Sequence, residues 1–89
     1  MWVVPYLAEF VGTFAFIFSI LATGNFLAIG ATLALVIYLI GDVSGGNVNP
    51  AVSVTMYLKG TLSATELVGY TIAQLLGGAA SFYTYKALV

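Results

Sequence analysis

At 89 residues the sequence has room for one domain at most, and 62% of it is hydrophobic whereas only 6% is charged. A soluble surface normally carries about 25% charged residues, so this composition excludes an ordinary soluble domain and indicates a membrane protein. The chain has no cysteine and no histidine, which excludes disulfides, thiolate metal sites and imidazole catalysis. A net charge of −1 without a basic cluster excludes nucleic acid as a partner.

The first apolar run predicts a transmembrane helix over about residues 2–22. Crossing about 30 Å of hydrocarbon takes about 20 helical residues. Trp2 and Tyr6 stand where interfacial aromatics are expected, and Pro5 falls in the first turn, where a missing N–H does little harm. The run lacks the positive start of a signal peptide and carries an acidic residue, Glu9, so we expect a mature helix.

Glu9 is the exception in this apolar helix. A carboxylate inside a membrane is costly and normally faces the bundle interior, where it needs a partner. The unpaired N–H groups of the loop at residues 44–50 are the expected donors. Two other interpretations stay open, namely a proton-relay carboxylate of a transporter and an acid that reaches the membrane surface.

A second transmembrane helix is predicted over about residues 26–41. The connection at residues 23–25 is too short for anything but a tight turn, so the first two helices should be antiparallel neighbours. Small residues such as Ala28, Gly30 and Ala31 lie among its large apolar residues. Small side chains let membrane helices approach closely, which predicts a packed helix.

Next come a loop over residues 42–49 and a short helix over residues 50–58. Asn49 is a strong N-cap residue, and Pro50 suits the first helical position, which has no use for an N–H. Gly45 and Gly46 permit positive φ and a close approach of the backbone. The short helix would be about 12 Å long at 1.5 Å per residue, so it cannot cross a bilayer and should return to the side it entered from.

Irregular backbone at membrane depth is tolerated where protein surrounds it or where it lines a water-filled cavity. The peptide groups of residues 45–48 could therefore contact a passing solute. A helix that starts at mid-membrane directs its positive dipole end into that path and disfavours cations. Asn49 could cap the helix with its oxygen and offer its NH2 group to the solute. An ordinary extramembrane turn is the alternative, because Gly-Gly and Asn-Pro are common in loops.

The last segment predicts a third transmembrane helix over about residues 63–87. Ser63 and Glu66 have the spacing of a capping box. Gly69, Ala73 and Gly77 recur every four residues and form a smooth stripe for close helix packing. This helix also carries one strongly polar interior residue, Gln74.

Three stretches together resemble the aquaporins, the major intrinsic protein family. The run Ser44-Gly45-Gly46-Asn47-Val48-Asn49-Pro50-Ala51-Val52 is similar to the family's first signature loop. Residues 8–14 resemble the opening of the family's first helix, and residues 73–78 resemble its third. The resemblance covers nearly the whole chain in the expected order. It implies an all-α membrane protein with three transmembrane helices, a re-entrant loop and a half-helix, which together form one aquaporin-like repeat over residues 1–89.

The resemblance also implies roles for single residues. Glu9 would brace the loop, and Gln74 would hydrogen-bond to it, although a general interhelical bond is the alternative for Gln74. Ile29 falls where the family's second helix contributes to the selectivity filter; otherwise it is a core or lipid-facing residue. The pore residues would then be Gly45, Gly46, Asn47, Val48, Asn49, Pro50, Ala51 and Ile29.

The function implied is a channel for water and small neutral solutes such as glycerol, in an integral, multi-pass membrane protein. No nucleophile–base pair, metal cluster or phosphate loop is present, so we expect no enzymatic activity, no cofactor and no metal. A non-conducting membrane assembly subunit and a proton-coupled transporter using Glu9 are the alternatives. The family's pore needs two inverted repeats. We therefore expect membrane lipid, a second half-repeat from another copy or a partner chain, and a higher homo-oligomer as partners.

Overall fold

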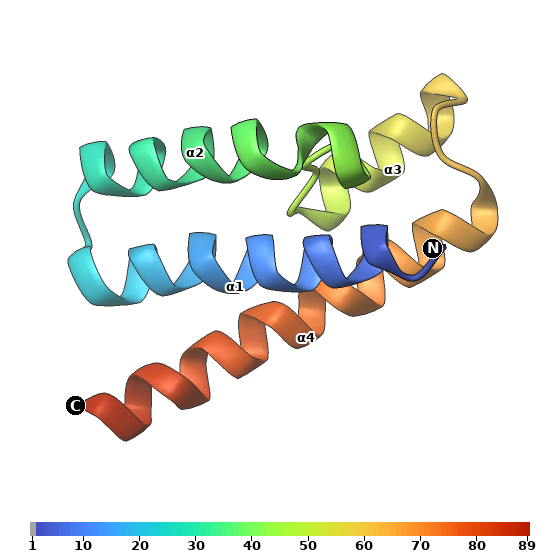
Figure 1. Ribbon diagram of the computed structural model, residues 1–89. Coiled ribbons are helices and arrows are strands. Elements are labelled where there is room, and N and C mark those ends of the chain that lie inside the picture. Colours follow the sequence, from blue (N-terminus) through green and yellow to red (C-terminus); the bar gives the residue numbers. More distant parts are fainter. Residues whose placement is uncertain (1) are drawn as a thin grey trace.

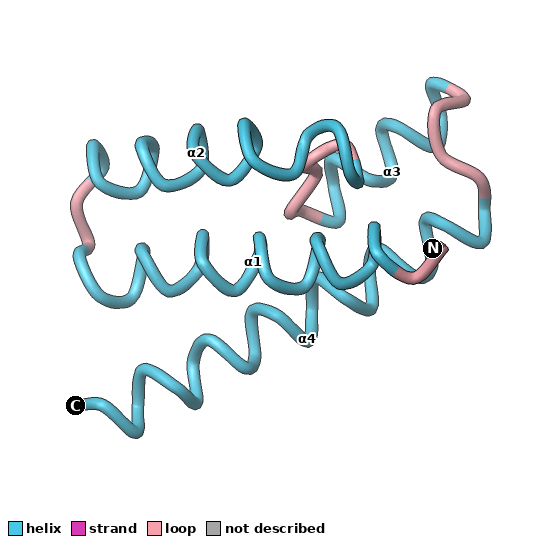
Figure 2. Tube along the Cα trace, viewed as in Figure 1, coloured by secondary structure: helices cyan, strands magenta, loops and turns pink. Residues whose placement is uncertain are grey.

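The computed structural model describes residues 2–89, and its regular structure in this range is entirely α-helical (Figure 1). The helices are α1 (Val4–Thr23), α2 (Phe26–Ser44), α3 (Pro50–Lys59) and α4 (Ala64–Leu88). Figure 2 shows that loops occupy only the short connections between them. The described chain measures 40 × 24 × 22 Å, so its long axis exceeds the hydrocarbon thickness of a bilayer, about 30 Å. The predicted all-α class is confirmed.

Two of the described helices, α1 and α2, are long and apolar enough to cross a membrane. They run antiparallel. The turn between them is short because its two residues, Gly24 and Asn25, are the C-cap of α1 and the N-cap of α2. Gly24 closes α1 in the left-handed conformation, with φ 57°. Asn25 then caps α2 by accepting hydrogen bonds from the N–H groups of Leu27 and Ala28.

The second helix is longer than its sequence predicted. It was expected to end near residue 41, but Asp42 and Val43 are helical and Ser44 is its last residue. The stop is Gly45, which has φ 96° and donates its N–H to the carbonyl of Gly41. A left-handed glycine cap ends a helix at the residue before it, so the irregular loop is residues 45–49 instead of 42–49.

The other helix ends follow local capping chemistry. Asn49 caps α3 as predicted, with its side chain accepting from the N–H of Ala51. The predicted capping box of α4 is also confirmed, because Ser63 and Glu66 each accept the other's backbone N–H. Both helices run one residue further than expected, to Lys59 and Leu88.

The first helix lies at the centre of the packing. It contacts α2 on one side and α4 on the other, and α3 packs on α4. The α1–α4 contact is close because of Gly77: a Cβ added there would lie 2.6 Å from the carbonyl oxygen of Phe10. Figure 1 also shows the loop before α3 folding back between α2 and the α1–α4 pair. This packing brings residues from all the helices around the loop.

Candidate functional site

The carboxylate of Glu9 is the centre of a buried polar cluster beneath the loop. Glu9 is fully buried (0% exposed). Its Oε2 accepts from Ser44 Oγ at 2.7 Å and from the N–H of Asn47 at 3.0 Å. Its Oε1 accepts from the N–H of Val48 at 2.7 Å and from Gln74 Nε2 at 2.9 Å. Every partner donates to Glu9 in this arrangement, and a carboxylate has about four lone-pair sites, so the four contacts match its capacity as an acceptor.

Ser53, on α3, closes this cluster into a ring. Its hydroxyl oxygen, fully buried, accepts from Gln74 Nε2 at 2.9 Å and from Asn47 Nδ2 at 3.1 Å. Because the backbone of Asn47 is bonded to Glu9, the ring passes through four residues on α1, the loop, α3 and α4. The Asn47 side chain is therefore buried against α3, and it is not presented on the outer side of the loop.

The loop backbone is unusual between its two anchors. Gly45 and Gly46 have φ 96° and 62°, and Val48 has φ 45°. A β-branched residue in this left-handed region is strained by about 1–3 kcal/mol and persists only where its surroundings hold it. Here Glu9 accepts a hydrogen bond from the N–H of Val48, and the Val48 side chain is buried beside Gly12.

The loop's N–H groups point inward, since that of Gly46 donates to Ser44 Oγ and the next two donate to Glu9. All described peptide bonds are trans. In a trans peptide the carbonyl points opposite to the N–H, so the carbonyls of residues 45–47 point away from Glu9. No described residue donates a hydrogen bond to them. The loop thus carries a row of acceptors that the described chain does not use.

Asn49 adds a donor at the end of this row. Its Oδ1 caps α3 at 2.8 Å from the N–H of Ala51, and its Nδ2 donates to no described group. Asn49 and Ala51 are exposed and Pro50 is half-buried. The tip therefore presents an amide donor beside the N-terminal end of α3, which is the positive end of the helix dipole.

A cavity of about 320 Å³ adjoins this tip between α1 and α4. The residues that line it are Thr13, Phe16, Ile17, Val48, Asn49, Pro50, Gln74, Leu75 and Gly78. Ile29 is not among them: it is half-buried in the first turns of α2, and 16 residues separate it from Gly45, about 24 Å along a helix. The structure thus brings Glu9, Gln74 and the loop together, and it leaves Ile29 apart from them.

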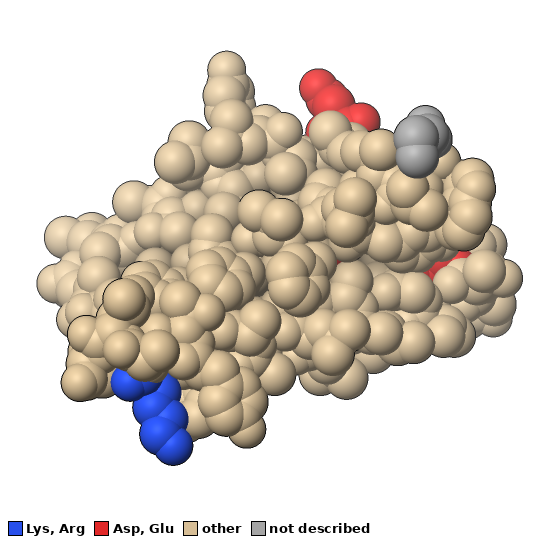
Figure 3. Space-filling view, turned by 60° about the horizontal axis from the view of Figure 1, so that its bottom comes forward, with Lys and Arg blue, Asp and Glu red and all other residues tan. Residues whose placement is uncertain are grey.

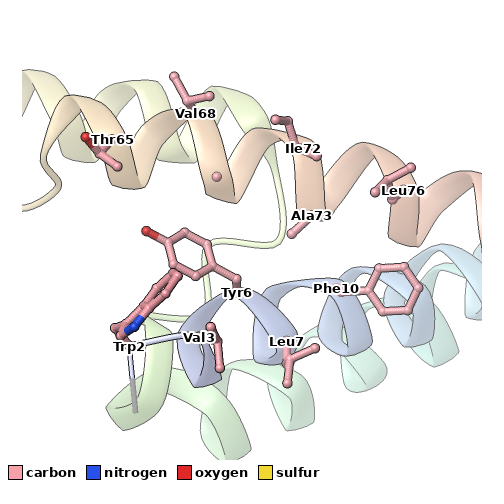
Figure 4. A pocket seen from close by; sticks show the side chains of 11 residues that line it. Trp2, Val3, Tyr6, Leu7, Phe10, Thr65, Val68, Ile72, Ala73 and Leu76 are labelled. Carbon is pink, nitrogen blue, oxygen red and sulfur yellow. The ribbon is translucent and has the colours of Figure 1, made fainter.

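The larger cavity is an apolar groove of about 710 Å³ between the first half of α1 and α4 (Figure 4). Figure 4 shows Trp2 and Tyr6 at one end of it and Phe10 and Leu76 at the other. None of the predicted site residues lines this groove. The face in Figure 3 is likewise almost free of charged side chains, as expected of a surface that meets lipid.

Sequence reasoning missed three residues that hold the loop, namely Ser44, Ser53 and Tyr70. The hydroxyl of Tyr70 donates to the carbonyl of Ser44 at 2.7 Å. Tyr70 precedes Gln74 by four residues, so both lie on one face of α4, and that spacing was a usable signal. The two serines gave a weaker signal, because a hydroxyl in an apolar helix commonly bonds to its own backbone.

Comparison with known proteins places this geometry in a family. The chain is 39% identical to the glycerol uptake facilitator protein-like 6 of Lactiplantibacillus plantarum, over 94% of this chain and 43% of that protein. It is 39% identical to aquaporin Z of Brucella melitensis and 35% identical to aquaporin Z of Photorhabdus laumondii. Those matches cover 83% and 80% of this chain, and 39% and 37% of the two relatives.

The chain thus spans about two-fifths of the length of these relatives. A family model described as major intrinsic protein matches residues 3–89. Members of this family are integral membrane proteins, and the two long apolar helices agree with membrane insertion. With a match over nearly its whole length, the chain belongs to the major intrinsic protein family.

Proposed function

We propose that this chain forms one half of the pore of a channel through which water and small neutral solutes such as glycerol pass down their gradients. The observation that carries the proposal is the orientation of the loop. Its N–H groups are bonded to buried oxygens, while its carbonyls and the amide of Asn49 are unused by the described chain. Water and polyols need both hydrogen-bond acceptors and donors to replace their hydration. The loop carbonyls supply the acceptors, and the amide of Asn49 supplies a donor.

The same geometry disfavours cations in the pore. The first N–H groups of α3 and the positive end of its dipole lie at the loop tip, next to Asn49. A cation at the tip would meet this positive end, whereas a neutral solute would not. The resulting channel passes neutral molecules in preference to ions.

In the membrane, α1, α2 and α4 would span the bilayer, and the loop with α3 would enter and leave on one side. The ten residues of α3 measure about 15 Å, half of the hydrocarbon thickness. Figure 1 supports this arrangement: the N-terminus and the end of α3 lie at one end of the molecule, and the α1–α2 turn and the C-terminus lie at the other. Since the chain has no cysteine, single cysteines at Lys59 and Lys86 can be labelled from each side. Labelling of both from the same side within individually oriented molecules would contradict this topology.

A second half-repeat would complete the pore. The relatives are more than twice as long as the stretch they share with this chain. The second half could belong to the same polypeptide, to another copy in the opposite orientation or to a partner chain, and the completed channel would assemble further as a homo-oligomer. Cross-linking of the assembled protein in membranes would identify which of these supplies it.

Stopped-flow swelling of liposomes that contain the assembled protein tests the channel. Faster swelling with water and with glycerol than in protein-free liposomes is expected. Ala51→Trp should return the rate to the protein-free level, because Ala51 is exposed beside the loop tip. Ala31→Trp, at an exposed position in the second turn of α2, is the matched control and should leave the rate unchanged.

The outcomes separate the alternatives. Swelling at the protein-free rate with every solute would favour a non-conducting assembly subunit. Flux that required a pH gradient would favour a proton-coupled transporter that uses Glu9.

A further inference from the structure

We infer that Tyr70 is a positioning residue for permeation, which fixes the start of the loop by holding the last carbonyl of α2. This inference rests on the proposed channel function and deepens it. It assigns a role to a residue that lies outside both the loop and the Glu9 cluster.

The contact is buried and short. Tyr70 is 3% exposed, and its hydroxyl donates to the carbonyl oxygen of Ser44 at 2.7 Å. The side chain of Ser44 donates at the same time to Glu9. Ser44 is thus held twice, through its backbone from α4 and through its side chain from α1.

This anchor acts where the chain is easiest to turn. The last carbonyls of a helix have no partner within the helix. The next residue, Gly45, has φ 96° and no side chain to restrict its rotation. Without the bond to Tyr70, the peptide between Ser44 and Gly45 would be held only by the hydrogen bond from the Gly45 N–H to the Gly41 carbonyl, so it could turn more easily and carry the loop carbonyls with it.

The bond also joins two helices that do not pack on each other. In the described chain, α2 packs on α1, whereas α4 packs on α1 and α3. Among the hydrogen bonds of residues 2–89, the one from Tyr70 to Ser44 ties α4 directly to the end of α2. The distance between α4 and the end of α2, where the loop starts, therefore depends on this tyrosine.

Packing fixes the phenol ring itself. The ring of Tyr6 meets that of Tyr70 edge to face, with centroids 5.6 Å apart and planes at 86°. Figure 4 shows Tyr6 projecting from α1 toward α4. Such aromatic contacts stabilise by about 0.5–1.5 kcal/mol beyond burial. The contact with Tyr6 therefore helps to orient the Tyr70 hydroxyl toward Ser44, independently of the hydrogen bond itself.

Amide hydrogen exchange in Tyr70→Phe tests the inference, since this variant removes only the hydroxyl. A net hydrogen bond contributes about 0.5–1.5 kcal/mol, so the amides of residues 46–48 should exchange about 2- to 10-fold faster. Tyr83→Phe is the matched control on α4: Tyr83 is 67% exposed and its hydroxyl bonds to no group within residues 2–89, so exchange should not change.

A flux measurement provides the readout that lost stability alone would not change. At equal amounts of assembled protein, Tyr70→Phe should alter the ratio of glycerol to water permeability, and Tyr83→Phe should not. Ser44→Ala removes the other hold on Ser44 and also the acceptor of the Gly46 N–H, so exchange is compared at the amides of residues 47 and 48, where its effect should not add to that of Tyr70→Phe. Additive effects would indicate two unrelated losses and would overturn the inference.

The two proposals fail in different ways. If the unaltered protein swells liposomes but Tyr70→Phe matches Tyr83→Phe in exchange and in permeability ratio, the channel stands and the role of Tyr70 is wrong. If the unaltered protein does not swell liposomes, the channel function fails, and the role in permeation fails with it. Solid-state NMR between the Tyr70 ring and the Ser44 carbonyl carbon needs no variant, and a missing contact would also overturn the inference.

Discussion

Replacing Glu9 tests the cluster most directly, because the structure predicts different costs for two substitutions. Glu9→Ala removes both acceptor oxygens. Ser44 Oγ can turn to the carbonyl of Ile40, which already lies 3.4 Å away, and Gln74 keeps its bond to Ser53. The N–H groups of residues 47 and 48 have no such alternative.

The magnitudes follow from counting unpaired donors. A buried N–H without an acceptor costs about 1–3 kcal/mol, so two of them predict a loss of about 2–6 kcal/mol for Glu9→Ala. Glu9→Gln keeps one oxygen for Val48 and Gln74, and its NH2 group can donate to Ser44 Oγ. One N–H, that of Asn47, is then left, which predicts a loss of about 1–3 kcal/mol. The loss of stability in Glu9→Gln should therefore be about half of that in Glu9→Ala.

Denaturant unfolding in a mild detergent measures both losses. Asp42→Ala and Asp42→Asn are the matched controls, because Asp42 is exposed on α2 and its carboxylate accepts no hydrogen bond from the described part of the chain. Both variants should stay within about 0.5 kcal/mol of the unaltered protein. Equal stability of Glu9→Ala and Asp42→Ala would refute the bracing role. If Glu9→Gln kept full stability and lost only flux driven by a pH gradient, the proton-relay interpretation would replace it.

Three further predictions use matched positions in the same chain. Gly77→Ala should lower the unfolding midpoint, because the added Cβ would lie 2.6 Å from the carbonyl oxygen of Phe10. Gly30→Ala, which has open space around it, should be neutral or slightly stabilising. Equal midpoints in the two variants would contradict the close contact between α1 and α4. Asn49→Asp keeps the capping oxygen but loses the amide donor, so glycerol flux should fall, and Asn25→Asp at the cap of α2 should leave it unchanged; equal flux in both would remove Asn49 from the pore. Val52→Arg should reduce proton and cation leak, since it adds a positive charge two residues after Pro50, close to the loop tip. An unchanged leak in a vesicle pH assay would contradict the prediction that residue 52 lies beside the pore.

The parts of the fold that depend on neighbouring residues could be predicted from the sequence. Asn49 and the Ser63–Glu66 pair act within three residues, so their pattern alone indicates where helices begin. The end of α2 was predicted too early: Gly41 and Asp42 resemble a stop, but the residue in the left-handed conformation is Gly45.

The site could be predicted only in part, because its contacts depend on how the helices cross. That Glu9 needs donors follows from its place in an apolar helix, and the unpaired N–H groups of residues 44–50, together with the family resemblance, indicated the loop as their source. Which donors it meets, and that Ser53 joins them, depends on residues 21 to 65 positions apart. No local pattern encodes those distances, and the same holds for the bond from Tyr70 to Ser44.

The spacing of the Glu9 partners along the chain also has a consequence for biogenesis. Ser44, Asn47 and Val48 follow Glu9 by 35 to 39 residues, and Gln74 follows it by 65. During synthesis the chain emerges with its N-terminus first, so the carboxylate leaves the ribosome before any of its donors. A nascent chain whose emerged part ends before residue 44 would expose an unpaired acid to lipid, which favours a delayed release of α1 from the insertion machinery until the loop arrives. The loop would bind to Glu9 on α1 first, and α4 would pack last and complete the cluster with Gln74.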